Sequence, residues 1–168
     1  MMSGPEVLEI LDVLVEAGVE AWVDGGWGVD ALLGEQTREH EDVDLVIALE
    51  DGRRAGKALS ALAFFLGEDE RPTRFVLEHE DGRRIDFHTV VFDEEGGGVQ
   101  RLQDGRSYRY PPEGFAGEGV IGGRAVRCLT PEVQLECHLG YEPVETDRHD
   151  MRLLAERFGL RLPRAYRE

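Results

Sequence analysis

Two short motifs near the start of the chain place strong limits on its fold. The glycine pair Gly25-Gly26 opens an apolar segment that ends at Gly34, and Asp42 and Asp44 begin the next apolar run. Because glycine permits tight backbone turns, the pair predicts an abrupt turn into a helix. Side chains alternate between the faces of a strand, so the two aspartates point the same way. Neighbouring carboxylates repel each other unless a cation neutralises them. The pattern therefore predicts a metal site beside a helix start.

The hydrophobic pattern predicts helices and strands that alternate at first and are followed by hairpins. Apolar residues recur at helical spacing between Pro5 and Gly18, and β-like runs flank Asp81-Gly82, the strongest hairpin signal. We expect helices near 5–17, 25–33, 53–65, 130–139 and 147–158, strands near 21–23, 43–49, 74–80 and 83–92, a second hairpin around 122–123, and irregular structure over 101–115. This order predicts an α/β (α+β) fold with a mixed β-sheet flanked by helices. We expect a core over 1–128 and a small C-terminal helical extension, 129–168, packed on it.

The charge and apolar content of the chain favour some partners and disfavour others. The net charge of −16 disfavours long nucleic acids, because these are bound through Lys and Arg on the phosphates. Such a charge either attracts small cations, such as polyamine-like substrates, or keeps the surface solvated. No run approaches the ~18 apolar residues of a membrane helix, and the N-terminus lacks the pattern of a signal peptide. We therefore expect a cytoplasmic protein without a membrane partner, in which Cys128 and Cys137 are reduced.

A third acidic residue lies on a strand whose alternation fixes its direction. Asp86 and His88 share one face of the expected strand 83–92. If this strand lies beside the one that Asp42 and Asp44 begin, three carboxylates converge. Carboxylate oxygens suit one or two Mg²⁺ ions, which also bind phosphate oxygens and would stabilise in-line displacement at phosphorus. Backbone N–H groups at a helix start bind phosphate as well. A nucleoside triphosphate carrying Mg²⁺ needs both features.

Other interpretations of the same residues explain less. Residues 26–31 also fit G-x-G-x-x-A, the dinucleotide fingerprint, with Glu50 about twenty residues further on. That interpretation leaves the three aspartates unexplained and requires a longer helix than one that ends at Gly34. His40 and His88 are candidate ligands, although isolated histidines are more often structural.

Taken together, the motifs resemble those of a known enzyme family. They are similar to the lincosamide and aminoglycoside adenylyltransferases of the DNA polymerase β-like nucleotidyltransferase superfamily. The resemblance covers most of the chain. It rests on GGWGVDALLG at 25–34, Thr37-Arg38, His40, Asp42, DLVI at 44–47, RIDFH at 84–88, HLGYE at 138–142 and DRHD at 147–150.

The resemblance implies a chemistry and a set of site residues. It implies that AMP is transferred from ATP to a hydroxyl of an antibiotic and that pyrophosphate is released. Asp42 and Asp44 would bind the metals, Mg²⁺ or Mn²⁺, and Asp86 would complete the site as a ligand or general base. The residues implied for nucleotide binding are Gly25, Gly26, Thr37, Arg38 and His40. Two alternatives stay open: an acceptor that is a protein or another metabolite, and a non-catalytic nucleotide-binding module.

The acceptor site is expected between the nucleotide site and the C-terminal helices. Loops on a rigid scaffold usually make the substrate contacts, and such loops hold several acidic residues that would suit a cationic acceptor. The expected contacts are Glu113, Glu118, Glu142 and Asp147.

Overall fold

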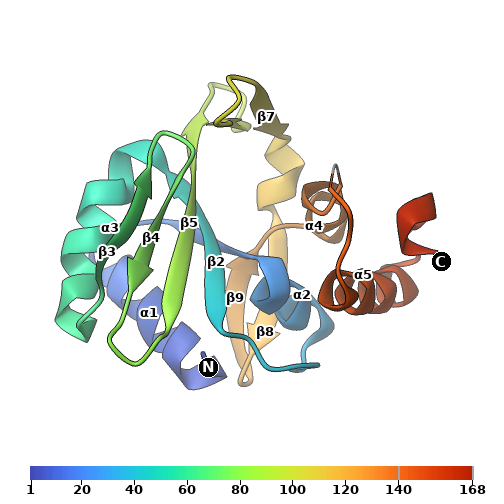
Figure 1. Ribbon diagram of the computed structural model, residues 1–168, viewed down its shortest axis with the longest axis horizontal. Coiled ribbons are helices and arrows are strands. Elements are labelled where there is room, and N and C mark those ends of the chain that lie inside the picture. The colour runs from blue at the N-terminus through green and yellow to red at the C-terminus, as the bar shows by residue number, and fades with distance from the viewer. Residues whose placement is uncertain (140, 168) are drawn as a thin grey trace.

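A mixed β-sheet forms the centre of the molecule and carries helices on both sides (Figure 1). The computed structural model describes residues 1–139 and 141–167. In these residues the sheet has nine strands, seven of them in the order β3-β4-β5-β2-β1-β9-β8, while β6 pairs with β5 and β7. The strands are β1 (Ala21–Asp24), β2 (Asp42–Ala48), β3 (Phe65–Glu70), β4 (Arg74–Glu78), β5 (Arg84–Phe92), β6 (Gly98–Arg101), β7 (Ser107–Tyr110), β8 (Gly117–Ile121) and β9 (Arg124–Cys128).

Strand pairing in the centre of the sheet makes it mixed. β2 runs parallel to β5 and antiparallel to β1, and β1 runs parallel to β9. The expected hairpins form, since β4 pairs antiparallel with β5 and β8 pairs antiparallel with β9. The predicted α/β fold with a mixed sheet is therefore confirmed.

Two helices cover one face of the sheet, α1 (Gly4–Glu16) and α3 (Gly52–Leu59) (Figure 1). The apolar stripe of α1 packs on the inward side chains of the central strands and forms the main core. Leu14 and Leu45 are both fully buried in this core. The alternation within β2 therefore assigns Val43, Leu45 and Ile47 to this core and leaves Asp42 and Asp44 on the opposite face.

The remaining helices lie toward the other side of the sheet (Figure 1). α2 (Gly25–Leu33) ends at Gly34, which has a φ of 80° and thus the left-handed conformation that glycine adopts readily. α4 (Pro131–Cys137) and α5 (Glu145–Phe158) both pack on α2. A separate apolar cluster joins Val29 of α2 to Met151 and Leu154 of α5.

Two segments differ from the expectations. The helix expected over 53–65 stops at Leu59, and a short 3₁₀ turn, Ser60–Leu62, follows it. Ala63 then has a φ of 61°, which ends the helical path and sends the chain into β3. The segment expected to be irregular, 101–115, contains β7, which pairs with β6 in a short hairpin at the top of Figure 1. Within the described residues, no helix is both long and apolar enough to cross a bilayer.

Candidate active site

Three aspartates form a row across the middle of the sheet. Asp24 is paired in register with Asp44, and Asp44 is paired with Asp86 on the parallel neighbour β5. Paired residues on adjacent strands point to the same face, so the three carboxylates share the face opposite α1 and α3. Asp42 lies two residues before Asp44 on the same face, where its register partner is Arg84. The predicted convergence of strands 43–49 and 83–92 is therefore present, with Asp24 as an additional acid.

Asp44, Asp86 and His88 form a compact group of potential metal ligands. One ligand atom from each lies within 4.8 Å of the others, and His88 Nε2 is 3.3 Å from Asp44 Oδ1. Arg74 Nη1 donates to Asp86 Oδ2 at 2.6 Å. Asp86 Oδ1, by contrast, is buried and has no hydrogen-bond partner among the described residues. One carboxylate oxygen is thus fixed by a guanidinium while the other stays unpaired beside Asp44 and His88.

The pKa values in this group reflect crowded, half-buried negative charge. Burial raises the pKa of Asp42, and the charges of Asp44 and Asp86 raise it further. Burial is also the main cause of the raised pKa of Asp86 and of the deeply buried Asp24. At His88, burial opposes the charged form, but the hydrogen bond and charge of Asp44, with Asp24 and Asp86, raise the pKa to about 9. The site is therefore suited to a cation.

The glycine pair at the start of α2 is required by close side-chain packing. A Cβ on Gly25, whose φ is 58°, would lie 2.2 Å from Asp44 Oδ2. A Cβ on Gly26 would lie 2.5 Å from both Arg38 Nη2 and His40 Nδ1. Larger residues would push these groups away from the helix start. The glycines therefore bring a carboxylate, a guanidinium and an imidazole against the positive end of a helix.

The other residues implied for nucleotide binding are fixed by acids behind them. Arg38 forms a bidentate pair with Asp150 of α5. His40 is buried, and its Nε2 lies 2.5 Å from Asp30 Oδ2. The hydroxyl of Thr37 donates to the other oxygen of Asp30 at 2.7 Å. Arg38 and His40 line the cavity described next, whereas Thr37 does not.

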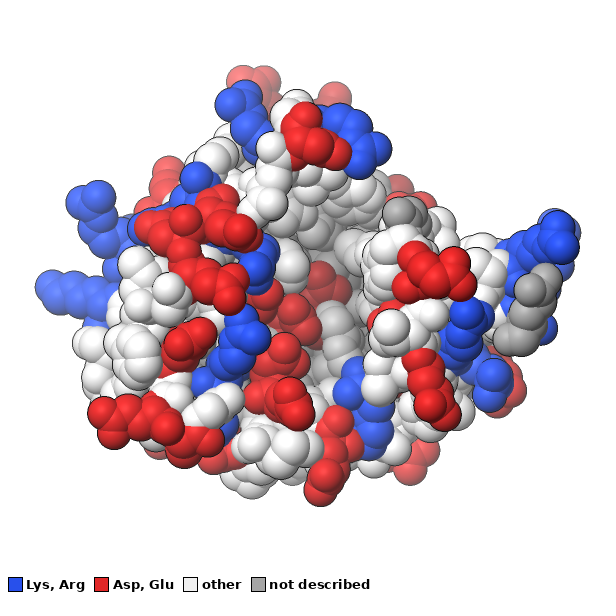
Figure 2. All heavy atoms as spheres, in the orientation of Figure 1, with Lys and Arg blue, Asp and Glu red and all other residues white. Residues whose placement is uncertain are grey.

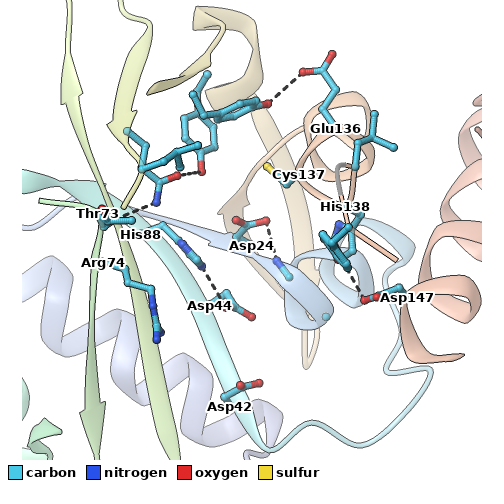
Figure 3. Close-up of a pocket in the computed structure, with 18 of the residues that line it drawn as sticks. Asp24, Asp42, Asp44, Thr73, Arg74, His88, Glu136, Cys137, His138 and Asp147 are labelled. Carbon is cyan, nitrogen blue, oxygen red and sulfur yellow. Dashed lines mark hydrogen bonds and ion pairs between the residues drawn. The ribbon is translucent and has the colours of Figure 1, made fainter. Parts of the chain in front are cut away.

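A cavity of about 580 Å³ opens above the aspartates, between the sheet and the C-terminal helices (Figure 3). Its floor contains Asp24, Asp42 and Asp44 with both glycines of the pair. Figure 2 shows acidic side chains gathered in the corresponding hollow. The walls come from the β6–β7 hairpin, from α4 with the residues after it, and from the start of α5. They supply Gln100, Leu102, Tyr108, Tyr110, Glu136, Cys137, His138, Leu139, Tyr141 and Asp147.

The four residues expected to bind the acceptor are placed in different parts of the molecule. Asp147 lines the cavity, with Oδ1 at 4.0 Å from His138 Nε2 (Figure 3). The described residues that line the cavity do not include Glu113, Glu118 or Glu142. Glu113 and Glu118 lie in the 3₁₀ turn before β8 and on β8 itself, and the side chain of Glu142 is 89% exposed.

Several residues of the cavity carry weak signals in the sequence. Asp24 has the clearest signal. It is an acidic residue at the end of an apolar strand and directly before a glycine turn, a position typical of site residues. The sequence pattern does not distinguish Glu136 and His138 from other polar residues near the end of a short helix. Tyr108 and Tyr110 alternate on β7, and their position depends on how the β6–β7 hairpin folds over the sheet. Tertiary packing, which local pattern does not encode, brings these walls to the aspartates.

Comparison with known proteins shows what kind of enzyme has this architecture. Residues 6–154 match the model of the family described as aminoglycoside-2''-adenylyltransferase. The chain belongs to this family. It is a nucleotidyltransferase, and its resemblance to antibiotic-modifying members, expected from the motifs, is confirmed.

The chain is similar to enzymes named for two classes of antibiotic. It is 32% identical over 149 residues to a lincosamide resistance protein of Staphylococcus haemolyticus, covering 89% of this chain and 92% of the relative. It is 35% identical over 123 residues to a 2''-aminoglycoside nucleotidyltransferase of Klebsiella pneumoniae, covering 71% of this chain and 63% of that protein. The chain thus spans less than two thirds of the aminoglycoside enzyme's length.

Solved structures show the same fold. The lincomycin-bound lincosamide adenylyltransferase LnuA is 32% identical and has a TM-score of 0.79, with 89% of this chain and 94% of that one covered. The aminoglycoside enzyme ANT(2'')-Ia, in complex with adenylyl-2''-tobramycin, is 23% identical and has a TM-score of 0.72, with 93% and 89% covered. The similarity to ANT(2'')-Ia, at 23% identity, shows that the folds agree and shows nothing further.

Proposed function

We propose that the protein transfers AMP from ATP to a hydroxyl group of a lincosamide or aminoglycoside antibiotic and releases pyrophosphate. The observation that carries the proposal is the group of Asp44, Asp86 and His88 beside the glycine-bounded start of α2, from which Asp44 and His88 line the cavity and Asp86 lies next to them in the sheet. Membership of the adenylyltransferase family supports the chemistry, and the names of the relatives support the two antibiotic classes.

The residues present fit a divalent cation. Asp44 presents a carboxylate to the cavity, in the row that it forms with Asp24 and Asp86 across the sheet. Asp42 contributes a further carboxylate that lines the same cavity. These are hard oxygen donors of the kind that Mg²⁺ and Mn²⁺ prefer. A cation bound there would neutralise phosphate oxygens and stabilise the charge that develops during displacement at phosphorus.

The start of α2 and its neighbours supply the site for the triphosphate. The backbone at Gly25 and Gly26 is open to the cavity, and the helix terminus favours negative charge. Arg38 and His40 lie against Gly26 on the same side, where the Arg38 guanidinium adds donors. We assign these four residues to holding the phosphates of ATP, with Thr37 as a residue that supports Asp30 and His40 from behind.

The reaction requires a proton acceptor for the antibiotic hydroxyl. Its oxygen attacks the α-phosphorus, the bond to the β-phosphate breaks, and pyrophosphate leaves with the bonding electrons. We assign the acceptance of the hydroxyl proton to Asp86 through Oδ1, since Arg74 occupies the other oxygen. The acceptor is held by the remaining cavity walls, where tyrosines offer flat apolar surface and Glu136 and Asp147 offer negative charge.

A transfer assay tests this function. The protein is incubated with Mg²⁺, α-labelled ATP and a panel of lincosamides, aminoglycosides and proteins, and the products are separated by mass. We expect label on a lincosamide or an aminoglycoside, with one pyrophosphate released per AMP transferred. Label on a protein alone, or ATP binding without any transfer, would contradict the proposal.

A further inference from the structure

Asp150 of α5 reaches the nucleotide end of the cavity through a single arginine. Arg38 Nε donates to Asp150 Oδ1 at 2.9 Å, and Arg38 Nη2 donates to Oδ2 at 2.7 Å. The two residues are 112 positions apart in the sequence. The Asp150 side chain is 3% exposed, and that of Arg38 is 27% exposed. A buried acid on the C-terminal helix therefore holds the back of a guanidinium whose front is open to the cavity.

The hydrogen bonds of Arg38 leave donors for a ligand. A guanidinium has five N–H donors in a rigid plane. Asp150 takes the Nε donor and one Nη2 donor, and the carbonyl of Glu39 takes one Nη1 donor at 3.1 Å. One donor on each Nη atom remains. Nη2 is the atom that lies beside Gly26 at the start of α2, so the pair fixes the guanidinium plane next to the helix terminus.

Glycine at position 26 makes this arrangement possible. A Cβ there would lie 2.5 Å from Arg38 Nη2, which is too close for the guanidinium to stay in place. The positive end of α2, its open backbone and the guanidinium of Arg38 thus lie at one place on the cavity wall. This is the combination that binds phosphate oxygens strongly, since hydrogen bonds between charged partners are short and strong.

We propose that Asp150 is a positioning residue for nucleotide binding, which aligns Arg38 with the phosphates at the start of α2. The inference rests on the proposed function for the location of the triphosphate, and it adds a role for the C-terminal helix. α5 lines the acceptor side of the cavity with Asp147, and it reaches the nucleotide side through the contact of Asp150 with Arg38. The same helix therefore supports both substrates from behind the walls.

A purely structural role for the pair makes a different prediction. If Asp150 serves only to dock α5, its replacement lowers stability and changes the apparent affinities for both substrates together or neither. If it aligns Arg38, its replacement weakens nucleotide binding and leaves the KM for the acceptor close to that of the wild type. Asn is almost isosteric with Asp, so Asp150→Asn removes the charge and one acceptor while the packing is kept.

The experiment is a double-mutant cycle read by nucleotide affinity. Binding of α,β-methylene-ATP with Mg²⁺ is measured by calorimetry for the wild type, Asp150→Asn, Arg38→Gln and the double variant. Asp12→Asn serves as the control, because Asp12 of α1 forms an exposed ion pair with Arg124 of β9 and neither residue lines the cavity. Urea unfolding of every variant shows that the folded state is intact at the assay temperature.

We expect Asp150→Asn to weaken nucleotide binding about tenfold, the change that one charge-assisted hydrogen bond supplies. In the Arg38→Gln background the same replacement should have no further effect on affinity, since Asp150 acts through Arg38. In Asp150→Asn the KM for ATP should rise without a change in the KM for the acceptor. The control variant Asp12→Asn should bind the nucleotide like the wild type.

Three outcomes decide the matter. Wild-type affinity in Asp150→Asn, or additive losses in the double variant, would overturn the inference and leave the proposed function standing. If both single variants are too unstable to assay, the double variant, which leaves no unpaired buried charge, still has to show weakened binding. A wild-type protein that binds no nucleotide would overturn the proposed function and this inference with it.

Discussion

Asp86 has two carboxylate oxygens in different surroundings, and this asymmetry leads to a test of its role. Oδ2 is held by Arg74 and Oδ1 is unpaired beside Asp44. We expect Asp86→Asn to lower kcat by roughly 10²–10⁴-fold, the usual cost of losing a general base. Nucleotide affinity, measured by calorimetry, should change much less. Turnover near that of the wild type would remove Asp86 from catalysis, and a collapse of nucleotide affinity would make it mainly a metal ligand.

Asp42 and Asp44 lead to a prediction about metal removal. Both carboxylates share one face of β2, and Asp44 also meets Asp24 and Asp86 across the sheet. A triphosphate brought to these acids would be repelled unless a divalent cation lies between them. We expect ATP binding to disappear in excess chelator and to return with Mg²⁺ or Mn²⁺, and we expect Asp44→Asn to bind Mn²⁺ weakly in spin-resonance titrations. Equal ATP affinity with and without chelator would exclude the proposed metal site.

At the scale of elements, the packing of α2 on β8 depends on a strand position without a side chain. A Cβ on Gly119 would lie 2.5 Å from the carbonyl carbon of Ala31, a backbone atom that has little room to move. We expect Gly119→Ala to destabilise the protein by about 1–3 kcal/mol through overpacking. Gly56→Ala in α3 is the control, because a Cβ there meets nothing within 4 Å. It should stabilise by about 0.5–1 kcal/mol.

Urea unfolding measures both changes as shifts in midpoint at constant slope. A neutral Gly119→Ala variant would show that α2 shifts freely over β8. Such freedom would also be hard to reconcile with the tight contacts of Gly25 and Gly26 at the other end of the helix, since all three glycines define one position of α2.

Local pattern was sufficient for the elements that carry the metal-binding face and insufficient for those that enclose it. Alternation was enough to place Asp42 with Asp44 on one face of β2 and Asp86 with His88 on one face of β5, because successive side chains of a strand point to opposite faces. That β2 and β5 are neighbours was a condition that the pattern did not supply. The helix expected over 53–65 ends early because the chain turns at Ala63, where no glycine announces the change. β6 and β7 are four residues each, which is too short for periodicity to reveal.

The acceptor wall was the least predictable part of the site for a related reason. Glu113 and Glu118 were expected there because they lie in an irregular or polar stretch, yet β8 carries Glu118 on the edge strand, apart from the cavity. Glu136 and His138 reach the cavity because α4 packs on α2, and that contact involves residues about a hundred positions apart. Sequence pattern predicts which face of an element is polar and leaves open which polar faces meet.

At the scale of the whole molecule, the net charge of −16 leads to a prediction that separates the two classes of acceptor. Acidic side chains gather in the hollow that contains the cavity (Figure 2), and Glu136 and Asp147 lie on its acceptor wall. A polycationic aminoglycoside would be held there by charge pairs, which salt screens over a length of about 10 Å at ~0.1 M and about 3 Å at ~1 M. A lincosamide has fewer charges and would depend more on the tyrosines.

We therefore expect the dissociation constant of an aminoglycoside to rise steeply with salt and that of a lincosamide to change little, when both are measured by calorimetry with Mg²⁺ present. Asp147→Asn should weaken the aminoglycoside more than the lincosamide. Glu16→Gln, at the exposed end of α1, removes one negative charge far from the cavity and is the control for net charge. If Glu16→Gln matches Asp147→Asn, long-range attraction by the whole surface accounts for binding. If neither variant nor salt affects the aminoglycoside, the acidic wall does not bind the acceptor, and the charge of the molecule serves to keep its surface solvated.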